Sequence, residues 1–107
     1  MNKEEACKLY QKLYKILVNN SNETWSIEKT NLRFESEYTG LHINKYGTIQ
    51  IYNKSKLHCL DGPAIIGEDG YNEFHINGIH YFYTNFFRQP EVIKHQAKKL
   101  LNSILSF

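Results

Sequence analysis

Hydrophobic residues recur with the period of an α-helix at both ends of the chain. Residues 3–18 carry apolar side chains at the spacing i, i+3, i+4, i+7, namely Ala6, Leu9, Tyr10, Leu13, Ile16 and Leu17. Residues 90–106 carry a second stripe, made of Ile93, Ala97, Leu100, Leu101, Ile104 and Leu105. Asn2 and Glu5 have the spacing of a capping box, and Pro90 suits the first position of a helix. The pattern predicts two amphipathic helices that flank a core, with a partner-binding helix as the alternative for residues 3–18.

Between these helices the hydrophobic period changes to two. Apolar residues alternate with polar neighbours around Trp25 and Ile27, Leu32 and Phe34, Leu41 and Ile43, and Ile49 and Ile51. This alternation is typical of antiparallel strands with one solvated face. We therefore predict a β-meander over residues 24–84, with about six or seven strands in one layer.

The end of this meander is marked by turn signals at regular intervals, which are Asp61-Gly62-Pro63, Asp69-Gly70 and Asn77-Gly78. A type I′ turn needs positive φ at both central residues, for which Asn-Gly is the preferred pair. Such a turn at Asn77-Gly78 pairs Ile76 with Ile79, His75 with His80, and Phe74 with Tyr81. The same rule applied at Asp69-Gly70 pairs Ile65 with Phe74, and Ala64 with His75.

These pairings sort the side chains onto two faces, because successive residues of a strand point to opposite sides. The face predicted to point at the core carries Ile65, Phe74, Ile76, Ile79, Tyr81 and Tyr83. The face predicted to be solvated carries Glu73, His75, His80 and Phe82. The strand is expected to continue through Tyr81-Phe82-Tyr83. Overall we predict one α+β domain over residues 1–107, with an antiparallel sheet flanked by an N-terminal and a C-terminal helix.

Residues 57–81 also resemble a repeat unit. The matching segments are Leu57-His58, Asp61-Gly62-Pro63-Ala64, Asp69-Gly70, Glu73-Phe74 and Asn77-Gly78-Ile79-His80. They are similar to the short repeats written L-H-R-x-D-G-P-A, D-G and E-W-Y-x-N-G-x-x-H in uncharacterised bacteriophage, prophage and giant-virus proteins. Cys59 replaces the arginine of that pattern, Phe74 replaces the tryptophan, and no second Asp-Gly-Pro-Ala follows His80. The resemblance implies a viral or prophage origin and a β-hairpin scaffold. It assigns no active-site residues to this chain.

Composition and charge narrow the function classes. With 13 basic and 11 acidic residues the net charge is only +2, so the whole protein exerts little pull on nucleic acid. A nucleic-acid-binding module that uses the lysine-rich helix faces is therefore an alternative and not our first choice. The sequence has no apolar run long enough to cross a membrane and no secretory signal, which predicts a cytoplasmic protein. Cys7 and Cys59 are isolated and are expected to be free thiols.

Glu73, His75 and His80 form the one chemically suggestive group in the sequence. Cross-strand neighbours lie about 5 Å apart, which is close enough for two imidazoles to share a metal ion or to assist proton transfer. Histidine is also an ordinary residue at half-buried positions, and histidines and Asp-Gly recur within the repeat pattern. We therefore expect a structural pair, with no metal, no cofactor and no catalytic residue, and we keep a metal-dependent enzyme as an alternative.

Aromatic side chains suggest a binding surface. The sequence has eight tyrosines and six phenylalanines, and one face of the strand through Tyr81 is already assigned to the core. We predict a partner-binding surface made of Glu73, His75, His80, Phe82, Phe86, Phe87 and Arg88, while leaving open that Phe82, Phe86 or Phe87 lies under the C-terminal helix. The function that fits best is a small non-catalytic phage or prophage accessory protein that binds and inhibits a host protein, for example as an anti-CRISPR-like inhibitor. Homodimerisation through the same surface is the rival explanation.

Overall fold

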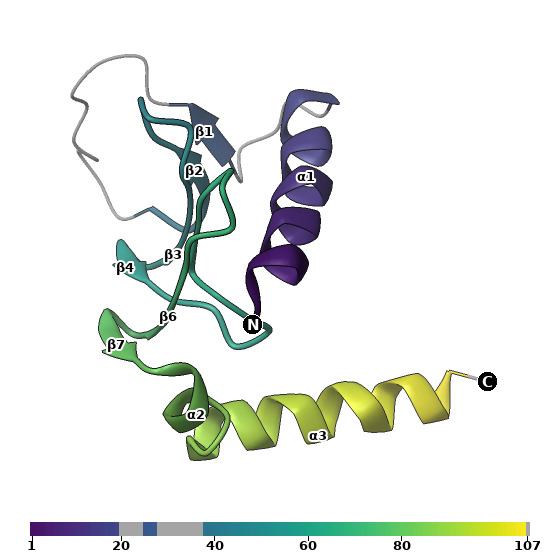
Figure 1. The fold of residues 1–107 in the computed structure, drawn as a ribbon. Coiled ribbons are helices and arrows are strands. Elements are labelled where there is room, and N and C mark those ends of the chain that lie inside the picture. Colours follow the sequence, from purple (N-terminus) through teal and green to yellow (C-terminus); the bar gives the residue numbers. More distant parts are fainter. Residues whose placement is uncertain (20–24, 28–37, 107) are drawn as a thin grey trace.

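The computed structural model describes residues 1–19, 25–27 and 38–106. Its elements follow one another as α1 (Lys3–Asn19), β1 (Trp25–Ile27), β2 (Gly40–Ile43), β3 (Ile49–Asn53), β4 (Lys56–Leu57), β5 (Ile65–Ile66), β6 (Asn72–Ile76), β7 (Ile79–Tyr81), α2 (Tyr83–Phe86) and α3 (Pro90–Leu105). The strands form one sheet in the order β1-β2-β3-β5-β6-β7, and β4 also pairs with β3. The α+β class and the predicted helices at either end are confirmed (Figure 1).

One strand pair departs from the predicted meander. β1 and β2 run parallel, with Trp25 opposite Leu41, whereas the other pairs among the described strands are antiparallel. A parallel pair cannot be joined by a hairpin, so the alternation of hydrophobic residues identified both strands but not their relative direction. The strand expected around Leu32 and Phe34 lies outside the described residues.

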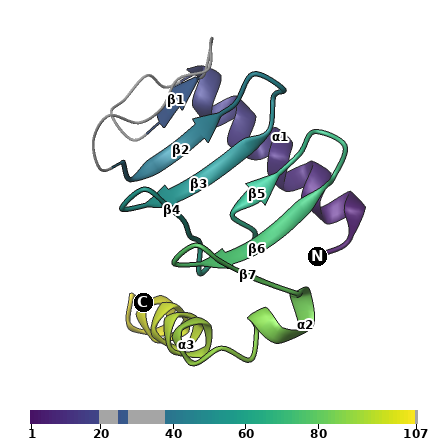
Figure 2. The same ribbon diagram turned by 90° about the vertical axis from the view of Figure 1, so that its left-hand side faces the viewer.

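Helix α1 covers one face of the sheet and forms the first of two cores. Asn2 Oδ1 accepts a hydrogen bond of 2.8 Å from the Glu5 N–H at its start, as the capping spacing predicts. Tyr10 packs with three sheet residues, Ile43, Ile49 and Ile66. The Tyr10 hydroxyl also donates a 2.6 Å hydrogen bond to the Gly47 carbonyl oxygen. The helix therefore lies flat on the sheet, and Figure 2 shows it behind the strands.

The hairpin of β6 and β7 has the predicted register. Ile76 pairs with Ile79, His75 with His80, and Phe74 with Tyr81. Asn77 and Gly78 both have positive φ, at 50° and 84°, as a type I′ turn requires. The local sequence of this turn was sufficient to predict it.

The preceding pair, β5 and β6, lies one residue out of the predicted register. Ile65 pairs with Glu73, and Ile66 pairs with Asn72. The connecting turn is longer than two residues, because the Gly67 N–H donates to the Tyr71 carbonyl at 2.7 Å. A shift of one residue exchanges the two faces of a strand. Ile66 is consequently buried in the first core, while Ile65 lies on the face of Glu73.

The strand β7 ends at Tyr81, two residues earlier than predicted, and the short helix α2 follows. Phe86 of α2 and Val92 of α3 pack on Phe74 and Ile76 to form a second core. Two residues expected in the core are exposed instead: Ile79, and Tyr83, which α2 removes from the sheet.

Helix α3 shows the largest difference from prediction, because its apolar stripe does not face the core. Among its described residues Val92 alone is buried. The stripe side chains Ile93, Leu100, Leu101, Ile104 and Leu105 are between 53% and 71% exposed. In Figure 1 the helix leaves the body of the protein beyond β7, with the C-terminus at its far end.

Candidate functional site

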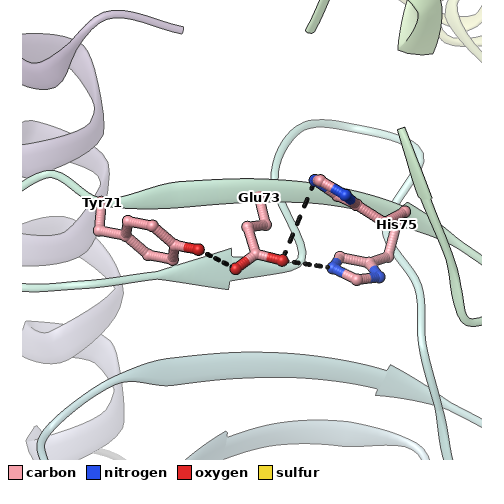
Figure 3. A network of polar contacts seen from close by, with 4 residues as sticks. Tyr71, Glu73 and His75 are labelled. Atoms are coloured by element: carbon pink, nitrogen blue, oxygen red, sulfur yellow. Dashed lines mark hydrogen bonds and ion pairs between the residues drawn. The ribbon is translucent and has the colours of Figure 1, made fainter. Parts of the chain in front are cut away.

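The strand β6 presents a row of polar side chains on the face of the sheet opposite α1. Tyr71 comes just before the strand, and Glu73 and His75 follow at intervals of two residues, so all three point to the same side. The register of the hairpin then places His80 of β7 directly opposite His75. Figure 3 shows Tyr71, Glu73 and His75 with their polar groups directed toward one another.

The Glu73 carboxylate lies at the centre of this group. Its Oε1 atom lies 3.1 Å from His75 Nε2 and 4.0 Å from His80 Nε2. Its Oε2 atom accepts a hydrogen bond from the Tyr71 hydroxyl. The two imidazole rings lie with their centroids 5.1 Å apart. Glu73, His75 and His80 therefore offer three potential metal-binding atoms, all within 4.8 Å of one another.

The three side chains differ in their exposure. His75 was predicted to be solvated, but it is buried, whereas Glu73 is partly exposed and His80 is exposed. His75 Nδ1 has no hydrogen-bond partner within the described part of the chain. Hydrogen bonding from Tyr71 lowers the pKa of Glu73, partial burial opposes this, and His75 and His80 lower it further. The carboxylate is thus held in its charged form at neutral pH.

Tyr71 is the member of the group that the sequence analysis missed. The same interval of two residues that linked Glu73 to His75 extends back to Tyr71 and could have identified it. Its hydrogen bond to Glu73 raises the pKa of the Tyr71 hydroxyl, which keeps the proton on the phenol.

His58 and Cys59 lie near this hairpin but do not join the group. His58 Nδ1 accepts a 3.0 Å hydrogen bond from the Asn77 N–H, so the ring holds the turn. Burial raises the pKa of the Cys59 thiol, which disfavours the thiolate form needed for metal binding. Helix α2 packs on Phe74, on the opposite face of the hairpin, so the group is not enclosed between hairpin and helix.

The aromatic residues predicted to bind a partner are divided by the fold. Phe86 is fully buried, which is the alternative left open above. Phe82 is 73% exposed, and its ring lies 5.7 Å from the ring of His80. Phe87 and Arg88 are exposed, and Phe87 stacks edge-on against the exposed ring of Tyr83 at 5.2 Å. The exposed aromatic surface therefore consists of Phe82, Tyr83 and Phe87.

The basic face of α3 is also divided. His95 Nε2 and Lys99 Nζ lie 2.9 Å and 3.0 Å from the same oxygen of Asp61. Lys94 and Lys98 are exposed.

Comparison of the chain with protein-family models, curated protein sequences and solved structures found no match. Within the described residues, the helices are too short or too polar to cross a bilayer.

Proposed function

We propose that the chain is a non-catalytic binding protein that docks the apolar stripe of α3 into a groove of a host protein. The observation that carries this proposal is the orientation of α3, whose apolar side chains are exposed while its polar side chains contact the domain.

This orientation can be followed on the helix itself. At 3.6 residues per turn, the residues that anchor the helix, Val92, His95 and Lys99, fall on one side. The apolar stripe is centred near Ala97, roughly 170° away from the mean direction of these three residues. Anchoring through the polar side therefore directs the stripe outward.

Exposing such a stripe is unfavourable for an isolated domain. Burying one Leu or Ile side chain stabilises a structure by about 1.5–3 kcal/mol, so a row of them is a strong potential binding surface. An amphipathic helix laid in an apolar groove is a common mode of recognition, with contacts at i, i+3, i+4 and i+7. Ala97, Leu100, Leu101 and Ile104 have this spacing.

The charges beside the stripe favour binding to a different protein over binding to a second copy of this chain. Lys94 and Lys98 are exposed along one edge of the stripe, and Glu91 is the single acidic residue of α3. Two copies packed stripe to stripe would gather like charges, which is unfavourable. A groove with an acidic rim would complement these lysines.

The exposed aromatic surface supports the same role. Phe82, Tyr83 and Phe87 lie on or next to α2, just before α3 in the chain. Aromatic side chains and arginine are the residues that most often dominate binding energy, and Arg88 follows directly. A partner that holds α3 could therefore use this surface as a second contact.

The proposed role as an inhibitor rests on the resemblance of residues 57–81 to phage and prophage repeats. A small protein that covers a surface of its target needs no catalytic group to block it. A component of a host defence system is the target that this origin suggests.

The proposal is tested with two matched double variants of α3. Leu100→Asp with Ile104→Asp places two carboxylates in the stripe, whereas Asn102→Asp with Ser106→Asp places two at the same spacing outside it. Both variants should unfold at the same temperature as the wild type, because all four side chains are exposed. A host protein captured by the wild type and then purified should bind the control variant, and should bind the stripe variant at least 10-fold more weakly in a titration.

Two outcomes would contradict this function. Equal binding of both variants would show that the stripe is not the contact surface. A wild-type dimer in sedimentation, with the stripe variant monomeric, would assign the stripe to self-association.

A further inference from the structure

We propose that Glu73, His75 and His80 form a binding site for a divalent transition-metal ion of the zinc type. This site lies on the sheet face opposite α1 and is not required for the docking of α3. It replaces the expectation, drawn from the sequence, that the two histidines are a purely structural pair.

The positions of the ligand atoms are close to those that a metal ion needs. Zinc binds histidine nitrogen and carboxylate oxygen at about 2.0–2.2 Å in a tetrahedral arrangement, which separates neighbouring ligand atoms by roughly 3.4 Å. Glu73 Oε1 and His75 Nε2 are 3.1 Å apart, and Glu73 Oε1 and His80 Nε2 are 4.0 Å apart. His80 is exposed, so its ring has room to move toward the other two ligands.

The surrounding residues hold two of the three ligands in place. The Tyr71 hydroxyl binds Glu73 Oε2, which leaves Oε1 to face the histidines. His75 is buried on β6, and the type I′ turn fixes its register against His80. Such supporting hydrogen bonds orient ligands and raise the affinity of a metal site, typically by roughly 10–100-fold.

The types of ligand select the class of ion. Two imidazoles and one carboxylate suit Zn²⁺, Ni²⁺ or Cu²⁺, whereas Ca²⁺ and Mg²⁺ prefer a set made entirely of oxygen atoms. Three protein ligands leave a position for water or for a group of a partner. Among the three ligands, His80 is the exposed one.

The surroundings of His75 Nδ1 limit the expected affinity. To bind a metal through Nε2, neutral His75 must carry its proton on Nδ1, which is buried without a partner among the described residues. A metal-bound histidine normally donates this second N–H to an acceptor. We therefore expect binding weaker, by roughly 10–100-fold, than at a site where both nitrogens are satisfied.

The test is a titration of the untagged, metal-free chain with Zn²⁺ against a chromophoric competitor. The wild type should bind one equivalent. His80→Ala, chosen because this side chain is exposed, should lose at least 10-fold in affinity without loss of fold. Tyr71→Phe should keep one equivalent at lower affinity, and His95→Gln, which removes a histidine far from the group in sequence, should bind like the wild type.

Spectroscopy and stability provide independent measurements. Co²⁺ in place of Zn²⁺ should give the absorption of a four-coordinate site in the wild type and not in His80→Ala. Saturating Zn²⁺ should raise the unfolding temperature of the wild type more than that of His80→Ala. Wild-type protein without saturable binding, or equal affinity in His80→Ala, would overturn the proposal. Either result leaves the α3 experiment unaffected.

Discussion

At the scale of single residues, the Asn77-Gly78 turn determines the register of the β6–β7 hairpin, which places His80 opposite His75. Gly78 has a φ of 84°, and the nearest described atoms to a Cβ there would be those of the Lys56 side chain, at 3.8 Å or more. Backbone strain and not crowding is therefore the obstacle to substitution. Gly78→Val should reduce the free energy of unfolding by more than about 1 kcal/mol, because a β-branched residue rarely adopts positive φ. Denaturant unfolding measures this change.

The matched control for this turn is Gly78→Asn. Asparagine tolerates the left-handed region far better than valine, so it should retain most of the stability. If valine and asparagine were equally tolerated, the turn would not have the conformation described here.

Asp69-Gly70 shows why one turn could be predicted from its sequence and the other could not. Gly70 has a φ of 92°, and a Cβ atom there would lie 2.7 Å from the carbonyl oxygen of Lys3. The start of α1 therefore packs against this turn. An Asp-Gly pair is compatible with several loop lengths. The loop that forms here is in contact with Lys3, which is far away in the sequence. No local pattern contains that information.

At the scale of elements, α3 is fixed to the domain by Asp61 as well as by Val92. Burial works against the charge of Asp61, but hydrogen bonds and attraction from His95 and Lys99 outweigh it and lower the pKa of the carboxyl. A carboxyl whose pKa is lower in the folded state stabilises that state above its unfolded pKa. This stabilisation is lost as the pH falls through the lowered value.

We therefore expect acid to loosen α3 before it affects α1. Protection factors from amide exchange, corrected for the intrinsic effect of pH, should fall first in α3 as the pH drops below about 4. Asp61→Asn should lower protection in α3 already at neutral pH. Glu91→Gln, on the same helix, provides the control. Simultaneous loss of protection in α1 and α3 would argue against a separate anchor at Asp61.

The existence of α3 could be predicted from its sequence, but its orientation could not. The spacing of Ile93, Leu100 and Ile104 reports that one side of the helix is apolar. It does not report what covers that side. The contacts of Asp61 with His95 and Lys99 link residues more than thirty positions apart and accompany the outward orientation. The grouping of Glu73, His75 and His80, by contrast, could be predicted from strand alternation and the Asn77-Gly78 turn.

At the scale of the whole molecule, the two cores have no described residue in common. Tyr10, Ile43, Ile49 and Ile66 form the first, and Phe74, Ile76, Phe86 and Val92 form the second. Phe86→Ala should cost about 3–5 kcal/mol locally and accelerate amide exchange in α2, α3 and β7 more than in α1. Ile49→Ala, as the counterpart, should act mainly on α1, β2 and β3. Equal acceleration throughout by either variant would mean that the domain opens as one unit.

The exposed stripe of α3 is less constrained by the stability of the fold than the core is. Side chains that contribute little to folding can change without reducing the amount of folded protein in the cell. Ile93, Leu101 and Leu105 are in this position because they are exposed. Folding therefore restricts these positions less than it restricts positions such as Phe86, which pack in the core.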